Sequence, residues 1–551
     1  MAAPKRSPQR AQALRAHDDW VQRRMSLLQP LPRAALVERL REGRRWDVAV
    51  IGGGATGLGV ALDAAARGFS TVLVEARDFA QGTSSRATKL AHGGVRYLAQ
   101  GDIGLVREAL RERGAMLANA PHLAQRLPLV MPSYRWWETA FYGTGLKAYD
   151  ALAGSRGIGD TEFLGARRTQ QLVPGVQPRG LAGGVRYWDG QFDDARLAVA
   201  LARTAAARGA LVINRIAVTG LLREGGRVHG LRMHDREGGG TIDVQAGCVV
   251  NATGIWVDEV RDMDREPGAP PRAPIVAPSQ GLHLVVARRF LPGDHAILVP
   301  RTGDGRVLFA VPWLGKTILG TTDTPRQHIE SEPRPLPEEV EFILREAARY
   351  LATPPRRDDV LSAWVGMRPL VRPDDEDGGG TKQISREHTV IVGRSGLVTV
   401  TGGKWTTYRA MAEDVLDRAM TRGVLAHRPG GVTERLPLVG AAPGRPLTDP
   451  PGEHLYGSEA AALRALPGAD RWLWRDGEGG LSEAMVRFAV RHEMARSVED
   501  VLARRCRLLF LDAREAARQA AAVARILGEE LGREVDTSEF EALAASYATL
   551  P

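Results

Sequence analysis

The chain has 551 residues, of which 44% are hydrophobic and 25% are charged. This length predicts two or three domains and favours a large enzyme, because single cores stop growing at about 250–300 residues. No stretch approaches the roughly 20 apolar residues of a membrane-spanning helix, and a formal net charge of +9 that is spread along the whole chain does not favour a nucleic-acid-binding protein.

The first 45 residues form an Arg-rich arm. The arm lacks the apolar core of a secretory signal, so we expect the protein to be cytoplasmic. A short helix from Pro32 to Glu42 places Leu36, Val37 and Leu40 on one face. We expect this helix to cap the domain that follows it.

Residues 46–75 have the pattern of half a dinucleotide-binding unit. An apolar strand (Val48–Ile51) precedes the glycine turn Gly52-Gly53-Gly54-Ala55-Thr56-Gly57, a helix of small residues (Ala55–Arg67) and a second strand (Thr71–Val74) that ends on Glu75. The glycines allow a pyrophosphate to approach the helix N-terminus, where N–H groups and the helix dipole favour an anion. An acid in the position of Glu75 suits a ribose hydroxyl. The alternative is a plain glycine turn between a strand and a helix.

Strands and helices continue to alternate beyond this unit. We expect a helix at 195–208, a strand that closes at 249–254, strands at 281–286, 306–311 and 317–320, and a strand, glycine turn and helix at 397–411. The Pro- and Gly-rich sequence at 428–452 predicts a linker. Helical spacing of apolar residues predicts that 482–531 is almost wholly helical.

The sequence after Glu75 is not an ordinary continuation of a nucleotide-binding unit. It resembles the signature of FAD-dependent glycerol-3-phosphate dehydrogenases, and the similarity covers about residues 46–425 in the order of that family. The motifs that carry the resemblance are Gly82-Thr83-Ser84-Ser85-Arg86-Ala87-Thr88-Lys89-Leu90-Ala91-His92-Gly93-Gly94-Val95-Arg96-Tyr97-Leu98, Pro121-His122-Leu123, Tyr187-Trp188-Asp189-Gly190, Asp193-Asp194-Ala195-Arg196, Asn251-Ala252-Thr253-Gly254, Gly320-Thr321-Thr322-Asp323-Thr324, Gly366-Met367-Arg368-Pro369-Leu370 and Gly402-Gly403-Lys404-Trp405-Thr406-Thr407-Tyr408-Arg409.

The resemblance implies an α/β fold of the D-amino-acid-oxidase and glutathione-reductase type. Such a fold has a Rossmann-like FAD-binding domain, a β-sheet substrate domain and, in this chain, a C-terminal helical domain. The expected division is 1–45 for the basic arm, 46–425 for the oxidoreductase unit, 426–452 for a linker and 453–551 for the helical domain. Within the unit, 46–130, 183–270 and 362–425 are expected to bind FAD, and 131–182 and 271–361 to bind the substrate.

FAD is the cofactor that the family motifs imply. The glycine turn would hold its pyrophosphate, Glu75 its ribose, and the 402–407 turn the reduced flavin ring, because a helix N-terminus stabilises negative charge. The residues expected at the cofactor are Gly52, Gly54, Thr56, Gly57, Glu75, Thr83, Ser84, Ser85, Lys89, Ala252, Thr253, Gly254, Gly403, Lys404, Thr406 and Thr407.

The implied substrate, sn-glycerol 3-phosphate, is a small dianion with a secondary alcohol. Its site needs cations for the phosphate and a base near the C2 hydroxyl, while hydride leaves C2 for flavin N5 and dihydroxyacetone phosphate forms. The motifs place Arg96, Tyr97, Arg368 and Lys404 at the substrate. For catalysis we prefer His92 as the base, with His283 as the second candidate, because imidazole titrates near neutrality. Arg368 could also assist alkoxide formation without a dedicated base.

A membrane quinone is the electron acceptor that the resemblance implies, in the catabolism of glycerol and of glycerophospholipid-derived carbon. Aromatic residues gather between Tyr134 and Tyr142, near Lys147 and Tyr149. They suit either the headgroup level of a bilayer or a quinone entrance, or an internal contact between domains. The resemblance favours peripheral attachment to the inner face of the cytoplasmic membrane. A homodimer and a monomer are both open.

The sequence gives no indication of a metal site. Cys248 and Cys506 show neither metal-ligand nor disulfide spacing. The acidic run Asp374-Asp375-Glu376-Asp377-Gly378 lacks the terminal Glu of a calcium loop.

Three rival functions stay open. One is a glycerol-phosphate oxidase, which would pass electrons to O2 and release peroxide. Another is an oxidase-like flavoenzyme that acts on an amine, and the third is a basic binding protein without flavin.

Overall fold

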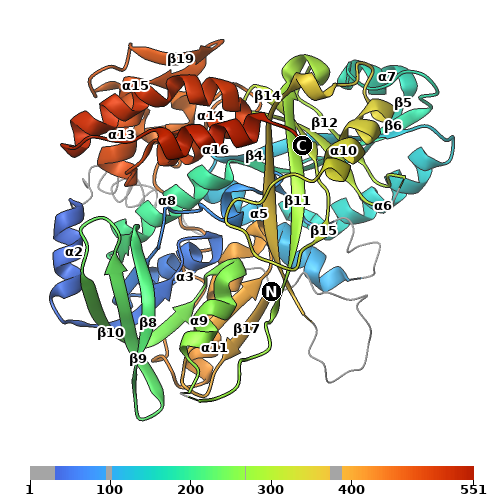
Figure 1. The fold of residues 1–551 in the computed structure, drawn as a ribbon. Coiled ribbons are helices and arrows are strands. Elements are labelled where there is room, and N and C mark those ends of the chain that lie inside the picture. Colours follow the sequence, from blue (N-terminus) through green and yellow to red (C-terminus); the bar gives the residue numbers. More distant parts are fainter. Residues whose placement is uncertain (1–31, 95–101, 267, 304, 373–387) are drawn as a thin grey trace, which may run out of the picture.

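The computed structural model describes residues 32–94, 102–266, 268–303, 305–372 and 388–551. These residues form two large β-sheets with their covering helices and a C-terminal group of helices (Figure 1). The expected N-terminal helix is α2 (Arg33–Arg41), which buries Leu36, Val37 and Leu40. Most of the basic arm lies outside the described residues.

The first sheet has eight strands within the described residues, and its centre is parallel. The strand order is β17-β18-β10-β1-β2-β7, and β8 and β9 extend it from β10 as an antiparallel pair. Because β18, β10, β1, β2 and β7 run in parallel, their carboxyl ends meet at one edge. The strands are β1 (Arg45–Ile51), β2 (Thr71–Val74), β7 (Leu211–Ile213), β8 (Ile216–Glu224), β9 (Arg227–Asp235), β10 (Thr241–Asn251), β17 (His388–Val392) and β18 (Val398–Gly402).

Helix α3 (Ala55–Ala66) lies against the first sheet and packs between α8 (Asp194–Ala207) and α11 (Tyr408–Thr421). Its small residues make this close packing feasible. A side chain at Gly59 would approach the Tyr408 ring to within 3.0 Å. The strand–turn–helix–strand unit predicted at 48–74 is therefore present with nearly the expected bounds.

The second sheet has ten strands within the described residues. Its order is β15-β11-β14-β13-β12-β4-β6-β3, with β16 paired to β11 and β5 paired to β6. The strands are β3 (Leu90–Ala91), β4 (Ala124–Ser133), β5 (Glu162–Gly165), β6 (Gly183–Phe192), β11 (Val276–Ala287), β12 (Ala296–Val299), β13 (Leu308–Trp313), β14 (Lys316–Gly320), β15 (Thr324–Pro325) and β16 (Val360–Val371).

In the part of the chain that the structure describes, five further helices accompany the two sheets. Helix α10 is amphipathic and buries Val340, Phe342 and Ile343 against the second sheet, as helical spacing of apolar residues dictates. Helix α6 lies on β5 and β6, at the side of the molecule opposite the C-terminal helices (Figure 1). The five are α5 (Ile103–Asn119), α6 (Glu138–Ala153), α7 (Ala166–Leu172), α9 (Val257–Met263) and α10 (Pro337–Tyr350).

The C-terminal part is mainly helical, as expected, but 482–531 is not one continuous helical run. A six-residue π-helical turn, η9 (Asp500–Arg505), interrupts it, and Asp512 caps a new helix by accepting a hydrogen bond from the Glu515 N–H. A short hairpin of β19 (Trp472–Asp476) and β20 (Gly479–Ser482) lies between the first of the C-terminal helices and the other four. The helices are α12 (Ala460–Arg464), α13 (Glu483–Glu493), α14 (Leu508–Leu511), α15 (Ala513–Leu531) and α16 (Ser538–Ala548), several of them shown in red in Figure 1.

Residues 426–452, expected to be a linker, contain no helix or strand. They are nevertheless anchored, because the Leu438 N–H donates to the Asn119 carbonyl and the Val439 N–H to the Thr204 hydroxyl. The expected division into domains stays a prediction. Strands β4, β6 and β16 belong to the second sheet, although all or part of each strand lies in a range that was expected to bind FAD. Among the described residues, no helix combines the length and the apolar character needed to cross a bilayer.

Candidate active site

A cavity of about 2030 Å³ lies between the carboxyl edge of the first sheet and the second sheet. Single small-molecule sites typically occupy about 300–1,000 Å³, so this cavity has room for an extended dinucleotide and a further small molecule. Both sheets contribute to its wall, from Gly52 and Glu75 on one side to His283 and Arg368 on the other. The position agrees with the general placement of ligands in open α/β sheets.

The glycine turn connects β1 to α3 at the edge of the cavity. Gly52, Gly54 and Thr56 line the cavity, whereas Gly57 lies behind the turn. A Cβ atom at Gly57 would come within 2.0 Å of the Gly52 carbonyl oxygen, so only glycine permits this close packing. The N-terminus of α3 is thereby directed at the cavity, where it favours an anion.

Glu75 is fixed at the end of β2. Its carboxylate accepts hydrogen bonds from the Gly53 N–H at 2.7 Å and the Arg77 N–H at 2.8 Å. Burial raises the pKa of this carboxyl above its ordinary value, although the two hydrogen bonds oppose the shift. The acid therefore lines the cavity next to the glycine turn, where the sequence predicted it.

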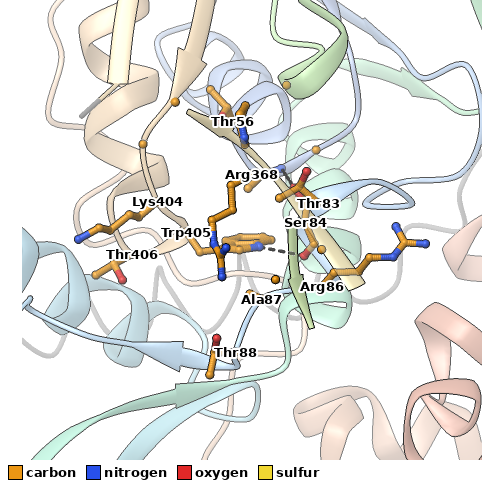
Figure 2. Close-up of a pocket in the computed structure, with 18 of the residues that line it drawn as sticks. Thr56, Thr83, Ser84, Arg86, Ala87, Thr88, Arg368, Lys404, Trp405 and Thr406 are labelled. Atoms are coloured by element: carbon orange, nitrogen blue, oxygen red, sulfur yellow. Dashed lines mark hydrogen bonds between the residues drawn. The ribbon is translucent and has the colours of Figure 1, made fainter. Parts of the chain in front are cut away.

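The segment after Glu75 forms another part of the wall. Thr83 and Ser84 line the cavity. The Thr83 hydroxyl donates to the Met367 carbonyl at 2.6 Å, and the Trp405 indole N–H donates to the Ser84 carbonyl at 2.9 Å. Figure 2 shows Thr83, Ser84 and Arg86 on one side of the site and Lys404 and Thr406 on the other, with Arg368 drawn between them.

Two residues of the same segment do not reach the cavity wall. The Lys89 side chain is fully buried and donates to the Asp194 carboxylate at 2.6 Å and to the Ser85 carbonyl at 2.8 Å. Ser85 is also buried behind the wall. The Lys89 side chain joins an interior ion pair and the Ser85 hydroxyl donates to the Gly82 carbonyl at 3.4 Å, so neither side chain lines the cavity, and the expectation that the two residues bind the cofactor stays a prediction.

Two further turns lie at the carboxyl ends of β10 and β18. Ala252, Thr253 and Gly254 line the cavity, as do Gly403, Lys404, Trp405 and Thr406. Thr407 is an exception, since its hydroxyl turns back to donate to the Lys404 carbonyl at 3.2 Å and does not line the cavity. The predicted site residues from three distant chain segments are thus brought together by the parallel strands.

Arg368, on β16, is held across neighbouring strand β11. Its guanidinium donates to the Asp323 carboxylate at 3.1 Å, to the Thr321 hydroxyl at 3.1 Å, to the Thr322 carbonyl at 3.0 Å and to the Gln280 carbonyl at 3.3 Å. Gly281 makes room for it, because a Cβ atom there would lie 2.3 Å from a guanidinium nitrogen. One positive charge is thereby fixed in the cavity wall.

The two candidate bases differ in their surroundings. His283 is buried, stacks on Trp364 with ring centroids 4.1 Å apart, and shares a 2.9 Å hydrogen bond between its Nε2 and the Thr88 hydroxyl. Burial, with help from the charges of Lys89 and Arg368, lowers its pKa well below the ordinary histidine value. His92 is half-buried in the cavity wall.

Arg96 and Tyr97, expected at the substrate, lie outside the described residues, as does the acidic run 374–378. Sequence reasoning assigned no role to Thr88, Thr321, Asp323 and Trp405, which all line the cavity. Each of these four residues lies within one of the motifs that carry the family resemblance, and membership of a motif was the sequence signal that could have identified it. In the described residues no group of three or more His, Cys, Asp or Glu side chains could hold a metal ion.

An apolar extension of the cavity reaches helix α6. Leu129, Met131, Tyr142, Leu298 and Phe309 line it. The aromatic side chains in and just before this helix differ in their exposure to solvent. Tyr149 is buried. Trp136, just before α6, and Phe141, in its first turn, are 88% and 66% exposed.

The glycine turn, the acid after β2 and the two turns at the carboxyl edge fit FAD, because they offer helix N-terminal donors and a carboxylate along one extended cavity. The fold and the site thus define an FAD-dependent oxidoreductase. In agreement, a family model described as "FAD dependent oxidoreductase" matches residues 47–409, and one described as "C-terminal domain of alpha-glycerophosphate oxidase" matches 431–538.

Similarity to individual proteins narrows the class. The mitochondrial glycerol-3-phosphate dehydrogenase of Arabidopsis thaliana is 41% identical over 88% of this chain and 82% of its own, and that of Homo sapiens is 40% identical over 91% and 73%. An X-ray structure of the Bacillus halodurans glycerol-3-phosphate dehydrogenase complexed with FAD has a TM-score of 0.73 and 29% identity, and the match covers 94% of this chain and 98% of that chain. The chain belongs to the family of FAD-dependent glycerol-3-phosphate dehydrogenases.

Proposed function

We propose that this protein oxidises sn-glycerol 3-phosphate to dihydroxyacetone phosphate and delivers the electrons to a membrane quinone. The observation that carries the proposal is the fixed charge of Arg368 in the wall of a cavity that also fits FAD. A phosphorylated alcohol calls for such a cation, whereas an amine substrate does not. The names of the similar dehydrogenases support the same substrate.

Different residues of the chain would bind the cofactor and the substrate. The glycine turn with Thr56, Glu75, and the turns at 252–254 and 403–406 would hold FAD, which supplies the acceptor for the hydride that leaves C2. Arg368 and Lys404 would hold the substrate phosphate, together with Arg96 as the sequence motif predicts. The hydrogen bonds that Arg368 makes to Thr321 and Asp323 preorganise it for this task.

For proton removal from the C2 hydroxyl we propose His92. The pKa of His283 is lowered because burial disfavours its charged form, so His283 is a weak base. Its stacking on Trp364 and its hydrogen bond to Thr88 suit an orienting group. His92 lines the cavity and is only half-buried, which allows it to accept a proton and pass it to water.

The test is to follow the flavin absorbance anaerobically while sn-glycerol 3-phosphate is added, and then a water-soluble quinone analogue. Bleaching followed by recovery supports the substrate and the quinone together. A yellow protein that does not bleach contradicts the substrate. Recovery with O2 and release of peroxide, but not with quinone, favours the rival oxidase.

For the membrane we propose peripheral attachment through the start of α6, on the inner face of the cytoplasmic membrane. Exposed aromatic rings at Trp136, Trp137 and Phe141 occur in the same chain stretch as the exposed cations Arg135 and Lys147. Aromatic rings at headgroup level with basic neighbours are typical of interfacial helices. This helix also borders the apolar extension of the cavity, through which a quinone could enter.

Sedimentation with anionic vesicles tests this attachment. The double variant Trp136→Ser, Phe141→Ser should bind vesicles more weakly and keep its activity with a water-soluble acceptor. The variant Ile391→Ser is a control for general loss of exposed apolar surface, because Ile391 is 37% exposed on β17 of the first sheet, whereas α6 lies on strands of the second sheet. Equal vesicle binding by the double variant and the unaltered protein would contradict the proposed attachment.

A further inference from the structure

The chain segment 78–89, here called the cradle segment, forms the wall of the cavity along eight residues. Two of its residues have backbone conformations that L-amino acids rarely adopt: Ala80 has φ 58° and Lys89 has φ 65°. Such conformations persist only where the surrounding structure holds them. The contacts on the side away from the cavity therefore decide whether the cradle segment keeps its shape.

The first of these contacts is made by the turn η9. The Asp78 carboxylate, fully buried at the start of the cradle segment, accepts hydrogen bonds from both Arg504 and Arg505, at 2.9 Å for the Arg505 Nη2 to the Asp78 Oδ1. Arg504 is held in turn by Glu499 at 2.6 Å and Asp500 at 2.7 Å. The C-terminal part thus places two buried cations on one carboxylate of the cradle segment.

The second contact lies at the other end of the segment. The Arg507 guanidinium, which is fully buried, donates to the Ser85 carbonyl at 2.8 Å and to the Asp194 carboxylate at 3.1 Å. The same carboxylate accepts from the Ala87 N–H at 3.0 Å and from Lys89. Arg507 itself has φ 67°. The backbone of the cradle segment is therefore hydrogen-bonded directly to a C-terminal arginine.

The ion network just described joins the basic groups Lys89, Arg504, Arg505 and Arg507 to the carboxylates of Asp78, Asp194, Glu499 and Asp500. Removal of one partner of a buried ion pair leaves an uncompensated charge, and the penalty falls on the groups that remain. Here the remaining groups would be Asp78, Asp194 and Lys89, which belong to or support the cradle segment. Loss of one of these C-terminal arginines would thus destabilise the cradle segment, which forms part of the cavity wall, although none of the three arginines lines the cavity itself.

We propose that the C-terminal part is a cofactor-retention element: Arg504, Arg505 and Arg507 hold the cradle segment in the shape that binds FAD. They are positioning residues, because they act through Asp78, Ser85 and Asp194 and do not touch the cavity. This role concerns the retention of FAD and is independent of which substrate the enzyme oxidises.

The test compares FAD release from the purified holoenzymes of Arg505→Gln, Arg507→Gln and the unaltered protein, by the rise of free-flavin fluorescence after dilution. We expect release to be about tenfold faster or more in both variants, since each breaks a buried ion pair. Hydrogen exchange of the amides in 78–89 should also become faster. Arg505→Lys, which keeps the charge, should restore slower release.

The matched control is Arg203→Gln. Arg203 forms a bidentate ion pair with Glu459, at 2.5 Å and 2.7 Å, which also joins α8 to the C-terminal part but does not touch the cradle segment. FAD release from this variant should be unchanged. Equal acceleration in Arg203→Gln, or unchanged release and exchange in Arg505→Gln and Arg507→Gln, would overturn the proposal. If Arg507→Gln does not fold, the comparison of Arg505→Gln with Arg505→Lys decides by the same two measurements, because faster release and exchange are expected only in Arg505→Gln.

Discussion

Replacement of Arg368 by glutamine tests whether the fixed guanidinium grips the substrate phosphate. The guanidinium of Arg368 is hydrogen-bonded to Thr321, Thr322 and Asp323 at 3.0–3.1 Å, and its side chain is only 28% exposed. Because the side chain is already held in place, it loses little further conformational entropy when it binds a phosphate. A hydrogen bond to a charged group contributes about 1.5–3 kcal/mol. We therefore expect kcat/KM for sn-glycerol 3-phosphate to fall by roughly 10- to 200-fold.

The assay is anaerobic flavin reduction at varied concentrations of sn-glycerol 3-phosphate and, in parallel, of glycerol. Loss of a phosphate contact should lower kcat/KM for the phosphorylated substrate and leave kcat/KM for glycerol, which carries no phosphate, unchanged. Gly281→Ala should give the same selective loss, since its Cβ would displace the guanidinium. Arg236→Gln, at an exposed arginine of the same cavity, is the control and should have no effect. An equal loss for both substrates in Arg368→Gln would refute phosphate binding and indicate a role in the chemical step.

Three other predictions follow from the contacts described above. Gly57→Ala should be purified with little flavin, because its Cβ would lie 2.0 Å from the Gly52 carbonyl oxygen; a normal ratio of flavin absorbance to protein would contradict this. His283→Gln should keep the fall of kcat/KM towards acid pH, because the lowered pKa of His283 keeps this ring neutral; disappearance of that fall would make His283 the base. Burial lowers the pKa of His122 to about 3. Below about pH 6.5 this histidine is therefore protonated in the unfolded chain but stays neutral in the folded chain. The free energy of unfolding consequently decreases as the pH falls from about 6.5 towards 3. The loss is about 1.4 kcal/mol at about pH 5.5, and denaturant unfolding of His122→Gln at that pH and near pH 7.5 should show a smaller difference than in the unaltered protein.

The parts of the site that follow strands could be predicted from the sequence. A glycine turn after an apolar strand, and an acid after the next strand, are local patterns, and parallel pairing brings them to one edge. Glu75 and the turns at 52–57, 252–254 and 402–406 accordingly line the cavity together. The alternation of strand and helix was equally local and indicated a nucleotide-binding unit, whereas the fold class was implied by the resemblance to the family.

The direction of individual side chains was not predictable in the same way. Lys89 stands in a motif full of cavity residues, but its ammonium turns inward because Asp194, more than 100 positions away in the chain, accepts its hydrogen bond. Arg504, Arg505 and Arg507 look like the solvated face of a basic helix in the sequence. Their burial depends on Asp78 and on the π-helical turn, neither of which the local pattern reveals.

The strand order of the first sheet also bears on how the protein is made. β18 pairs with β10, which pairs with β1, so the edge that fits FAD is complete only when roughly 350 further residues have followed β1 out of the ribosome. At about 5–20 residues per second this takes roughly 20–70 s. Until residue 251 has been synthesised β1 also lacks β10, its direct neighbour, and until residue 402 the sheet lacks β18. We therefore expect cofactor loading to be a late event in synthesis, and a nascent chain that stalls before residue 398 to have an open sheet edge instead of a flavin site.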